Sequence, residues 1–444
     1  MKRRAAIISL GCAKNLVDAE VAVGALAAAG YELIDDAAAA DVVVVNTCAF
    51  VRDARREARA VVAEVSEKLG RRARLAIVGC FPQYAGTRLA AEFPRADVIL
   101  GVGEGAGLPE ALAAGKRVIR IGAPRPPLEG IAARPALTAP HVRFVKIAEG
   151  CGHPCSFCTI PRIRGPFRSR PGDEVVREAE EAAAAGVREV VLLAQDTSRW
   201  GADLEPRQDL AALLRRLART GVPWLRVLYL HPARVTDELV AAFAELKAVL
   251  PYFDLPLQHV VPRLLKAMGR PAWSPEKTLA RLARWRELAP GAVFRTSFIV
   301  GFPGETAADF DTLANFITAA ELDHVGVFEY SPEAGTAAAR LAGRVSLRVA
   351  RARREELMFR QQEVVAARYA ALEGKSVRLL VDSRLGRGVA VARAWFQAPE
   401  TDPVTLVDDG GRSRTGEFVR ARIVGHEGYE LIARVTARPG GGRA

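Results

Sequence analysis

The chain has 444 residues, half of them hydrophobic, so it is long enough for about three domains and can bury a sizeable core. No stretch approaches the ~18 uninterrupted apolar residues of a membrane-spanning helix, which excludes a helical membrane protein and predicts a soluble one. The formal net charge of +12 suits an RNA or ribonucleoprotein partner, but it also suits solubility alone.

The N-terminus has a basic start followed by a short apolar run at residues 5–10. This run is shorter than the ~7–15 apolar residues of a secretory signal and is followed by Lys14 and Asn15, so we expect a first β-strand. The expected location is therefore the cytoplasm. In that reducing compartment, the six cysteines favour metal or redox chemistry over disulfide bonds.

Residues 1–122 alternate between β-branched runs and helix-like runs, which predicts an open parallel α/β domain. Three cysteines each follow a strand-like run: Cys12 after "IISLG", Cys48 after "VVVVNT" and Cys80 after "LAIVG". Open α/β sheets assemble their sites at the carboxyl edge of the strands, so we expect these thiols to converge. The alternative is three independent core residues, since cysteine is often buried.

A proline-rich segment follows this domain. Residues 122–140 contain five prolines, which neither a helix nor a central strand tolerates, so we interpret the segment as a linker. The glycine-rich run "GVGEGAG" at residues 101–107 lacks the strand, helix and lysine of a nucleotide-binding loop. We therefore expect it to be a plain loop.

The second domain, expected over residues 138–372, repeats the α/β rhythm. Its strand-like runs are "RFVKIAE", "EVVLLAQD", "LRVLYL", "YFDLPLQ", "FRTSFIVG" and "HVGVFEYS". Six such runs joined by helical crossovers predict a partial (β/α)6 barrel. In such barrels, the chemistry is expected in the loops at the carboxyl ends of the strands.

The loop after the first of these runs, "EGCGHPCSFCTIPRIRG", carries Cys151, Cys155 and Cys158. Three thiols cannot complete a tetrahedral zinc site by themselves. On one tight loop they suit a cubane iron–sulfur cluster whose fourth iron stays open to another ligand. Incidental buried thiols are the weaker alternative, because free cysteines are rarely clustered.

The third domain is expected over residues 373–440. A long helix pattern at residues 345–373, rich in Arg, Glu and Gln, leads into a tail of short alternating runs such as "SVRLLVD" and "VAVARAW". Short alternating runs of this kind predict a small antiparallel β-barrel or sandwich.

The three-cysteine loop resembles the cluster motif of the radical S-adenosylmethionine superfamily, and Phe157 matches its usual aromatic position. With "SLGCAKNLVDAE", "NTCAF" and "PLQH", nearly the whole chain is similar to the methylthiotransferase family of that superfamily. The resemblance implies S-adenosylmethionine as cofactor, with a contact at Gln195, and two [4Fe-4S] clusters. Their ligands would be Cys151, Cys155 and Cys158 for the radical-forming cluster, and Cys12, Cys48 and Cys80 for an auxiliary cluster that carries sulfur. The resemblance also implies a C-terminal TRAM domain, and no catalytic side chain beyond the cluster ligands.

Other polar residues near the predicted strand ends allow two interpretations. His231 and His259 are expected to be hydrogen-bonded structural residues rather than metal ligands. The turn "FIVGFPGET" either punctuates the fifth strand or forms an edge for the adenosyl group. Four arginines after the cysteine loop form either a solvated face or a grip for substrate or phosphates. They are Arg162, Arg164, Arg168 and Arg170.

Within the family, the chain is more similar to the enzymes that modify a ribosomal protein than to those that modify tRNA. This implies methylthiolation of the β-carbon of an aspartate in ribosomal protein S-twelve, free or in the small subunit, with an electron donor and a sulfur source as partners. Glu333 supports this substrate, because the tRNA enzymes tend to carry a basic residue there. Acidic residues in the tail agree, since a surface that binds phosphates is expected to be more basic.

Two other functions stay open at this level. One is a tRNA adenosine methylthiotransferase, and the other is a non-catalytic iron–sulfur protein for RNA binding or electron transfer. An electron carrier normally has four protein ligands per cluster, whereas each set here has three, which favours an enzyme. Direct contact with nucleic acid is compatible with the sequence but not required by it.

Overall fold

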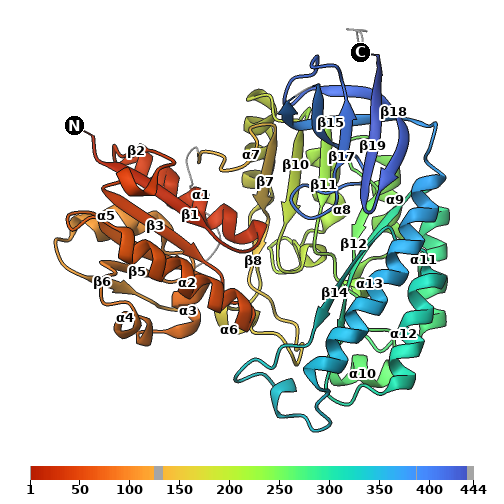
Figure 1. Cartoon of the computed structure of the whole chain (residues 1–444), viewed down its shortest axis with the longest axis horizontal. Coiled ribbons are helices and arrows are strands. Elements are labelled where there is room, and N and C mark those ends of the chain that lie inside the picture. The colour runs from red at the N-terminus through yellow and green to blue at the C-terminus, as the bar shows by residue number, and fades with distance from the viewer. Residues whose placement is uncertain (1, 125–133, 387, 438–444) are drawn as a thin grey trace.

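The computed structural model describes residues 2–124, 134–386 and 388–437 (Figure 1). The middle of the predicted linker, residues 125–133, and the last residues of the third expected domain, 438–440, lie outside the described residues. A parallel α/β sheet, an open α/β barrel and a small closed β-barrel follow one another along the chain, which confirms the predicted fold class.

The N-terminal sheet is parallel throughout, in the order β2-β1-β3-β4-β5-β6. Its strands are β1 (Arg4–Ser9), β2 (Glu32–Leu33), β3 (Val42–Thr47), β4 (Arg74–Gly79), β5 (Val98–Leu100) and β6 (Val118–Arg120). Its helices are α1 (Ala13–Ala28), α2 (Arg52–Lys68), α3 (Cys80–Ala85), α4 (Arg88–Glu92) and α5 (Leu108–Ala113). Successive strand residues point to opposite faces of the sheet, and each face is buried under its own helices. Helices α1 and α5 cover one face, and α2, α3 and α4 cover the other. Strands β2, β5 and β6 were missed in the sequence, since runs this short give no clear alternation.

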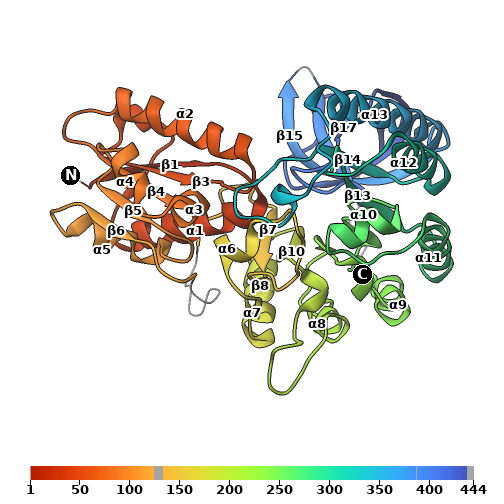
Figure 2. The same cartoon turned by 90° about the horizontal axis from the view of Figure 1, so that it is seen from below.

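The open barrel consists of six parallel strands with helices on its outer side (Figure 2). The strands are β7 (Val142–Lys146), β10 (Glu189–Leu193), β11 (Trp224–Val227), β12 (Tyr252–Asp254), β13 (Val293–Val300) and β14 (His324–Glu329). The main helices are α7 (Gly172–Ala184), α8 (Leu210–Leu217), α9 (Asp237–Glu245), α11 (Pro275–Leu288), α12 (Ala307–Ala320) and α13 (Leu347–Ala370). Shorter elements are β8 (Ala148–Glu149), β9 (Arg168–Ser169), α6 (Ile160–Arg164) and α10 (Pro262–Ala267).

The barrel strands form two three-stranded pieces, β7-β10-β11 and β12-β13-β14. Backbone hydrogen bonds join the pieces, from Leu225 N to Ala248 O at 2.7 Å and from Leu250 N to Leu225 O at 2.8 Å. In the described ranges, the edge strands β7 and β14 do not pair, so the barrel stays open on that side. This is the partial (β/α)6 barrel that the sequence predicts.

The C-terminal body is a closed five-stranded barrel in the order β15-β16-β17-β19-β18. The strands are β15 (Ser376–Gly386), β16 (Val389–Ala394), β17 (Thr405–Asp408), β18 (Phe418–Glu427) and β19 (Glu430–Ala437). The pairing of β17 with β19 is parallel and the others are antiparallel. The predicted small, mainly antiparallel β-barrel is thus present, and its one parallel pair, β17 with β19, could not be read from the sequence pattern.

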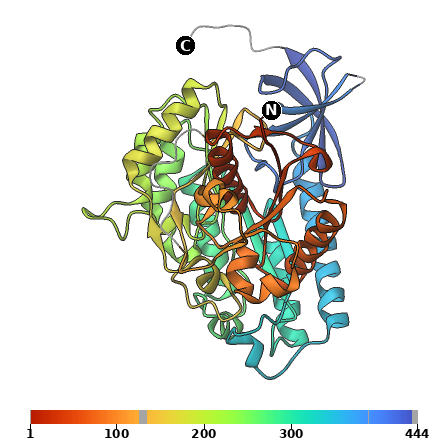
Figure 3. The same cartoon turned by 90° about the vertical axis from the view of Figure 1, so that its left-hand side faces the viewer.

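The small barrel covers the amino ends of the open-barrel strands, at one end of the molecule in Figure 3. Phe418 packs against Trp224, the first residue of β11, with ring centroids 4.9 Å apart. Leu380 and Ala398 join the same buried cluster, to which Val17 of α1 also belongs. One apolar core is therefore shared by all three bodies, and it leaves the carboxyl ends of the strands for the site.

Some acidic residues of the tail face inward, whereas Asp408, Glu427 and Glu430 are exposed. Asp402 accepts a hydrogen bond from Tyr252 at 2.6 Å and pairs with Arg295 at 3.2 Å. Asp382 is held by Arg393 at 2.6 Å. Counting acidic residues in the sequence therefore overstated the negative charge that this domain exposes, and that argument about the substrate is withdrawn.

Within the described ranges, no helix combines the length and the apolar character needed to cross a membrane.

Candidate functional site

The N-terminal cysteines lie at the carboxyl ends of three adjacent strands. Cys12 follows β1 and precedes α1, Cys48 follows β3, and Cys80 begins α3 directly after β4. Because β1, β3 and β4 are neighbours in the parallel sheet, their carboxyl ends share one edge. The sheet therefore gathers residues that are far apart in the sequence, as the strand pattern predicts.

Glycines allow these cysteine segments to approach closely. Gly11 has φ +93°, and a Cβ at this position would lie 2.7 Å from Cys48 Cβ. Gly79 has φ +96°, and a Cβ there would collide with the side chain of Asn46. Since L side chains rarely adopt such backbone angles, the Gly-Cys pairs of the sequence reflect a tight junction between strand ends.

The three thiols lie close enough to influence one another's ionisation. Burial raises the pKa of Cys80 to about 12, and the thiolates of Cys48 and Cys12 act in the same direction. Burial also raises the pKa of Cys48. At Cys12, desolvation opposes the thiolate, but the charges of Lys14 and Arg164 outweigh it and lower the pKa. The set thus combines one thiol whose pKa is lowered with two whose pKa values are raised, and a bound metal would favour the thiolate form of all three.

The second cysteine set is held on a loop between β8 and α6. Its backbone is anchored by hydrogen bonds from Cys151 N to Gly165 O at 3.1 Å and from Ser156 N to Met268 O at 2.9 Å. All three thiols are half-buried. Burial raises the pKa of Cys158 to about 12 and also raises the pKa of Cys151. These thiols therefore stay protonated at neutral pH unless a metal binds.

Neither cysteine set is arranged as the site of a single metal ion. Across the part of the chain that the structure describes, no three Cys, His, Asp or Glu side chains are arranged to hold one metal ion. A cubane requires a different arrangement, because each thiolate binds its own iron. Beside the second set, Arg270 Nη1 lies 3.9 Å from Cys155 Sγ, a distance for a hydrogen bond to a cluster ligand.

The two predicted cofactor contacts differ in their surroundings. Gln195 donates to Glu149 Oε1 at 2.7 Å, while its own amide oxygen is buried without a hydrogen-bond partner among the described residues. That oxygen can accept a bond from an ammonium group, such as the amino group of S-adenosylmethionine. Phe157 instead packs against a small apolar cluster that includes Met268 and Phe302.

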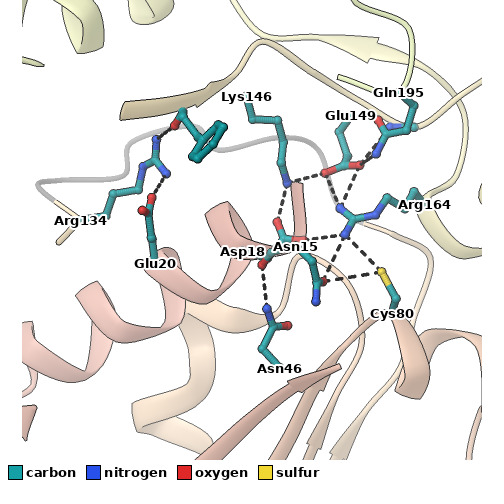
Figure 4. A network of polar contacts seen from close by, with 12 residues as sticks. Asn15, Asp18, Glu20, Asn46, Cys80, Arg134, Lys146, Glu149, Arg164 and Gln195 are labelled. Atoms are coloured by element: carbon teal, nitrogen blue, oxygen red, sulfur yellow. Dashed lines mark hydrogen bonds and ion pairs between the residues drawn. The ribbon is translucent and has the colours of Figure 1, made fainter. Parts of the chain in front are cut away.

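Arg164, on the helix that follows the second cysteine set, contacts a thiol of the N-terminal set (Figure 4). It ends α6, shortly after the second set, and is buried. Its guanidinium donates to Cys80 Sγ at 3.2 Å and to Glu149 at 3.1 Å, and it pairs with Asp18 at 2.9 Å. A residue from the cysteine loop of the barrel thus contacts a thiol of the N-terminal set.

Further buried ion pairs extend the Arg164 network into the barrel. Lys146 on β7 binds both Asp18 and Glu149, the latter at 2.7 Å (Figure 4). Burial opposes the charge of Glu149, but Arg164 and Lys146 hold the pKa of this carboxyl well below its usual range. The network was missed in the sequence, because its members come from separate elements and carry no common spacing.

The four arginines after the cysteine loop form neither one solvated face nor one grip for substrate or phosphates. Arg162 and Arg168 donate to backbone carbonyls at 2.8 Å and 3.0 Å. Arg164 and Arg170 are buried in ion pairs with carboxylates. The arginines therefore fasten the loop to the rest of the fold.

His153, inside the cysteine loop, is a polar candidate that sequence reasoning missed. It bonds Asp196 at 2.6 Å, and its ring stacks on His231 with centroids 4.1 Å apart. Burial, together with the charges of Arg270 and His153, lowers the pKa of His231 to about 3. The signal that could have found His153 is its position between two cluster cysteines.

His259 is structural, as expected. Its Nε2 lies 3.4 Å from Glu305 Oε1, and its Nδ1 accepts a hydrogen bond from Val261 N at 3.1 Å. Glu305 belongs to the turn "FIVGFPGET" and also pairs with Arg353 at 2.7 Å. These contacts favour the structural interpretation of that turn.

Glu333 forms a contact between the barrel and the N-terminal domain. It is buried, accepts a hydrogen bond from Arg52 N at 2.8 Å and pairs with Arg55 at 2.7 Å. Arg52 is the first residue of α2. The side chain therefore docks the loop after β14 onto the start of α2 and does not face a substrate surface.

Comparison with known families covers most of the chain. The description Uncharacterized protein family UPF0004 matches residues 4–101, Radical SAM superfamily matches residues 145–317, and TRAM domain matches residues 374–436.

Comparison with curated proteins is more specific. The ribosomal protein uS12 methylthiotransferase RimO of Desulfosudis oleivorans is 41% identical over 436 residues, which cover 96% of this chain and 98% of the relative. The protein of the same name from Solibacter usitatus is 42% identical and covers 97% and 94%. Among solved structures, the radical S-adenosylmethionine methyltransferase TsrM of Kitasatospora setae matches with a TM-score of 0.54 at 16% identity, covering 74% and 73%. That last likeness concerns the fold alone.

Proposed function

The chain belongs to the RimO family of ribosomal protein uS12 methylthiotransferases, and on that premise we propose how its residues hold the cofactors and the substrate. It is a radical S-adenosylmethionine methylthiotransferase that uses an iron–sulfur cluster. In the proposal, residues 1–122 carry an auxiliary cluster, residues 138–372 carry the radical chemistry, and residues 373–440 form the TRAM-like domain.

Two [4Fe-4S] clusters are proposed, one on each cysteine set. The auxiliary cluster is held by Cys12, Cys48 and Cys80, and the radical-forming cluster is held by Cys151, Cys155 and Cys158. When bound, the clusters and S-adenosylmethionine supply a radical that removes hydrogen from an unactivated carbon, and then sulfur and a methyl group. The substrate carbon is the β-carbon of an aspartate in uS12, the small-subunit protein S-twelve.

The chain's own residues orient these groups. Gln195 accepts a hydrogen bond from the amino group of S-adenosylmethionine through its free amide oxygen. Glu149 keeps the Gln195 amide in place, at 2.7 Å. Arg164 and Lys146 in turn hold Glu149 ionised. Phe157 supports the loop by packing beneath it.

One observation carries the proposal: Arg164, from the barrel's cysteine loop, donates to Cys80 of the N-terminal set at 3.2 Å. This contact brings the helix that follows the barrel set to the N-terminal set, which supports a common site for the two. A substrate carbon that loses hydrogen to one cofactor and gains sulfur from another needs both within reach.

The test is anaerobic reconstitution, followed by incubation with uS12 from cells that lack the enzyme and with bulk tRNA. Dithionite and sulfide serve as chemical stand-ins for the electron donor and the sulfur source, which remain part of the proposal. Mass spectrometry is expected to show a methylthio group on one aspartate of uS12. A methylthio group on a tRNA nucleoside, with uS12 unchanged, would overturn the assignment. The matched control is Cys155→Ala, which should modify neither.

A further inference from the structure

Lys14 is a buried cation at the junction between the N-terminal sheet and the barrel. It lies in the first turn of α1, two residues after Cys12, and only 7% of it is exposed. Its ammonium nitrogen lies 3.0 Å from the ring centroid of Tyr229. Tyr229 follows the carboxyl end of β11, so Lys14 reaches from the auxiliary cysteine set to the catalytic edge of the barrel.

The ammonium of Lys14 has three N–H donors, yet across the described residues no carboxylate forms an ion pair or hydrogen bond with it. Its neighbours are the Tyr229 ring and the Cys12 thiol, whose pKa its charge lowers. Lys146, the other buried lysine nearby, is paired with both Asp18 and Glu149. The N–H donors of Lys14 can therefore bind a carboxylate supplied from outside as their partner.

Arg164, the cation nearest to the N-terminal cysteines besides Lys14, is already paired. Arg164 pairs with Asp18 and Glu149, the same carboxylates that neutralise Lys146. Lys14 also lies at the amino end of the 16-residue helix α1, where the helix dipole favours an anion. Beside Cys12, Lys14 therefore offers a positive charge that no carboxylate of the described residues neutralises.

We propose that Lys14 is a positioning residue that binds the side-chain carboxylate of the substrate aspartate. This inference rests on the proposed function. In aspartate, the carboxylate is bonded directly to the β-carbon that receives sulfur. A carboxylate held two residues from Cys12 places that carbon beside the cysteine set assigned to the sulfur-carrying cluster. An adenosine offers no carboxylate, so Lys14 also selects a protein substrate.

The test measures binding rather than turnover. Reconstituted protein is titrated anaerobically with uS12 and with a uS12 variant whose target aspartate is asparagine. The wild-type protein should bind the aspartate form about tenfold to a hundredfold more tightly, the range of a hydrogen bond to a charged group. Lys14→Met should bind the aspartate and asparagine forms of uS12 with equal affinity. The effects of the Lys14 substitution and of the uS12 substitution would then be coupled. Lys14→Arg should restore part of the preference.

Controls separate this role from others. Lys116→Met, an exposed lysine of the same domain, should keep the full preference. Iron content and affinity for S-adenosylmethionine should be unchanged in Lys14→Met. If the preference for aspartate persists in Lys14→Met, or if that variant instead loses S-adenosylmethionine affinity, the assignment is overturned.

If the variants fail to fold, binding measurements on the wild-type protein still test the role of Lys14. If it modifies uS12 but binds the aspartate and asparagine forms equally, the role of Lys14 is wrong while the proposed function stands. If uS12 is neither bound nor modified, the proposed function itself fails, and the role of Lys14 falls with it.

Discussion

The two cysteine sets differ in how the chain brings them together. Cys151, Cys155 and Cys158 lie on one loop, whose shape depends on local turns and a few backbone hydrogen bonds. Cys12, Cys48 and Cys80 meet only because β1, β3 and β4 are neighbours in one sheet. The first arrangement is a local property of the sequence, whereas the second is a property of the fold.

Their electrostatic surroundings differ as well. The N-terminal set has Arg164 against Cys80, and the charges of Lys14 and Arg164 lower the pKa of Cys12. In the barrel set, burial raises the pKa values of Cys151 and Cys158. Two clusters of the same type would therefore sit in unlike environments, as expected for unlike tasks.

The largest expected effect separates the two tasks. Cys155→Ala should abolish cleavage of S-adenosylmethionine, because it removes a ligand of the cluster that delivers the electron. Cys48→Ala should still cleave the cofactor but should not form methylthiolated uS12. The measurement is 5′-deoxyadenosine by liquid chromatography after reduction. Equal loss of cleavage in both variants would show that the tasks are not divided in this way.

Iron content tests whether the two sets are independent. Reconstituted wild-type protein should carry about eight irons per chain, the sum of two four-iron clusters. Replacing Cys12, Cys48 and Cys80 together by Ala should leave about half, because the barrel loop is anchored by its own contacts. Full iron retention would rule out the N-terminal site.

Replacing Arg164 tests how the barrel is joined to the N-terminal cysteine domain. Arg164→Met leaves Asp18 and Glu149 buried without their guanidinium partner, so it should lower the free energy of unfolding by about 3–5 kcal/mol. Urea unfolding of the cluster-free protein measures the change. The matched control on the same helix is Arg162→Met, which removes one exposed hydrogen bond to Ala334 O and should cost about 1 kcal/mol or less. Similar losses for both variants would contradict the proposed junction.

The smallest effect concerns thiol reactivity in the cluster-free protein. Only the thiolate reacts with iodoacetamide, and the pKa of Cys12 is lowered while that of Cys80 is raised to about 12. At roughly neutral pH, iodoacetamide should therefore alkylate Cys12 several-fold faster than Cys80. Peptide mass spectrometry over time gives both rates. In Arg164→Met both thiols should react more slowly, since the charge of Arg164 lowers the pKa of each of them.

Sequence reasoning worked where the signal was local or repeated. The barrel cysteine loop and the long β-branched strands, such as β3 and β4, could be identified from spacing and alternation. The convergence of Cys12, Cys48 and Cys80 also followed, because parallel strands bring their carboxyl ends to one edge. Short strands such as β5 could not be identified, since three residues carry no period.

Contacts between distant residues could not be predicted. The bond from Arg164 to Cys80 spans 84 positions, and that from Arg393 to Glu189 spans 204. Nothing in a run of arginines tells which member is buried and which is solvated. The same limit applies to the acidic tail, where composition cannot reveal that Asp402 faces inward.

The core shared by the three bodies bears on how the protein is made. Val17 near the start, Trp224 in the middle and Phe418 near the end pack into one apolar cluster. During synthesis, the amino ends of the barrel strands remain uncovered until β18 has left the ribosome. A nascent chain that stops before Phe418 exposes Trp224 and its neighbours, surface of the kind that chaperones bind. Completion of the C-terminal barrel, residues 376–437, is therefore the step that covers the amino ends of the barrel strands.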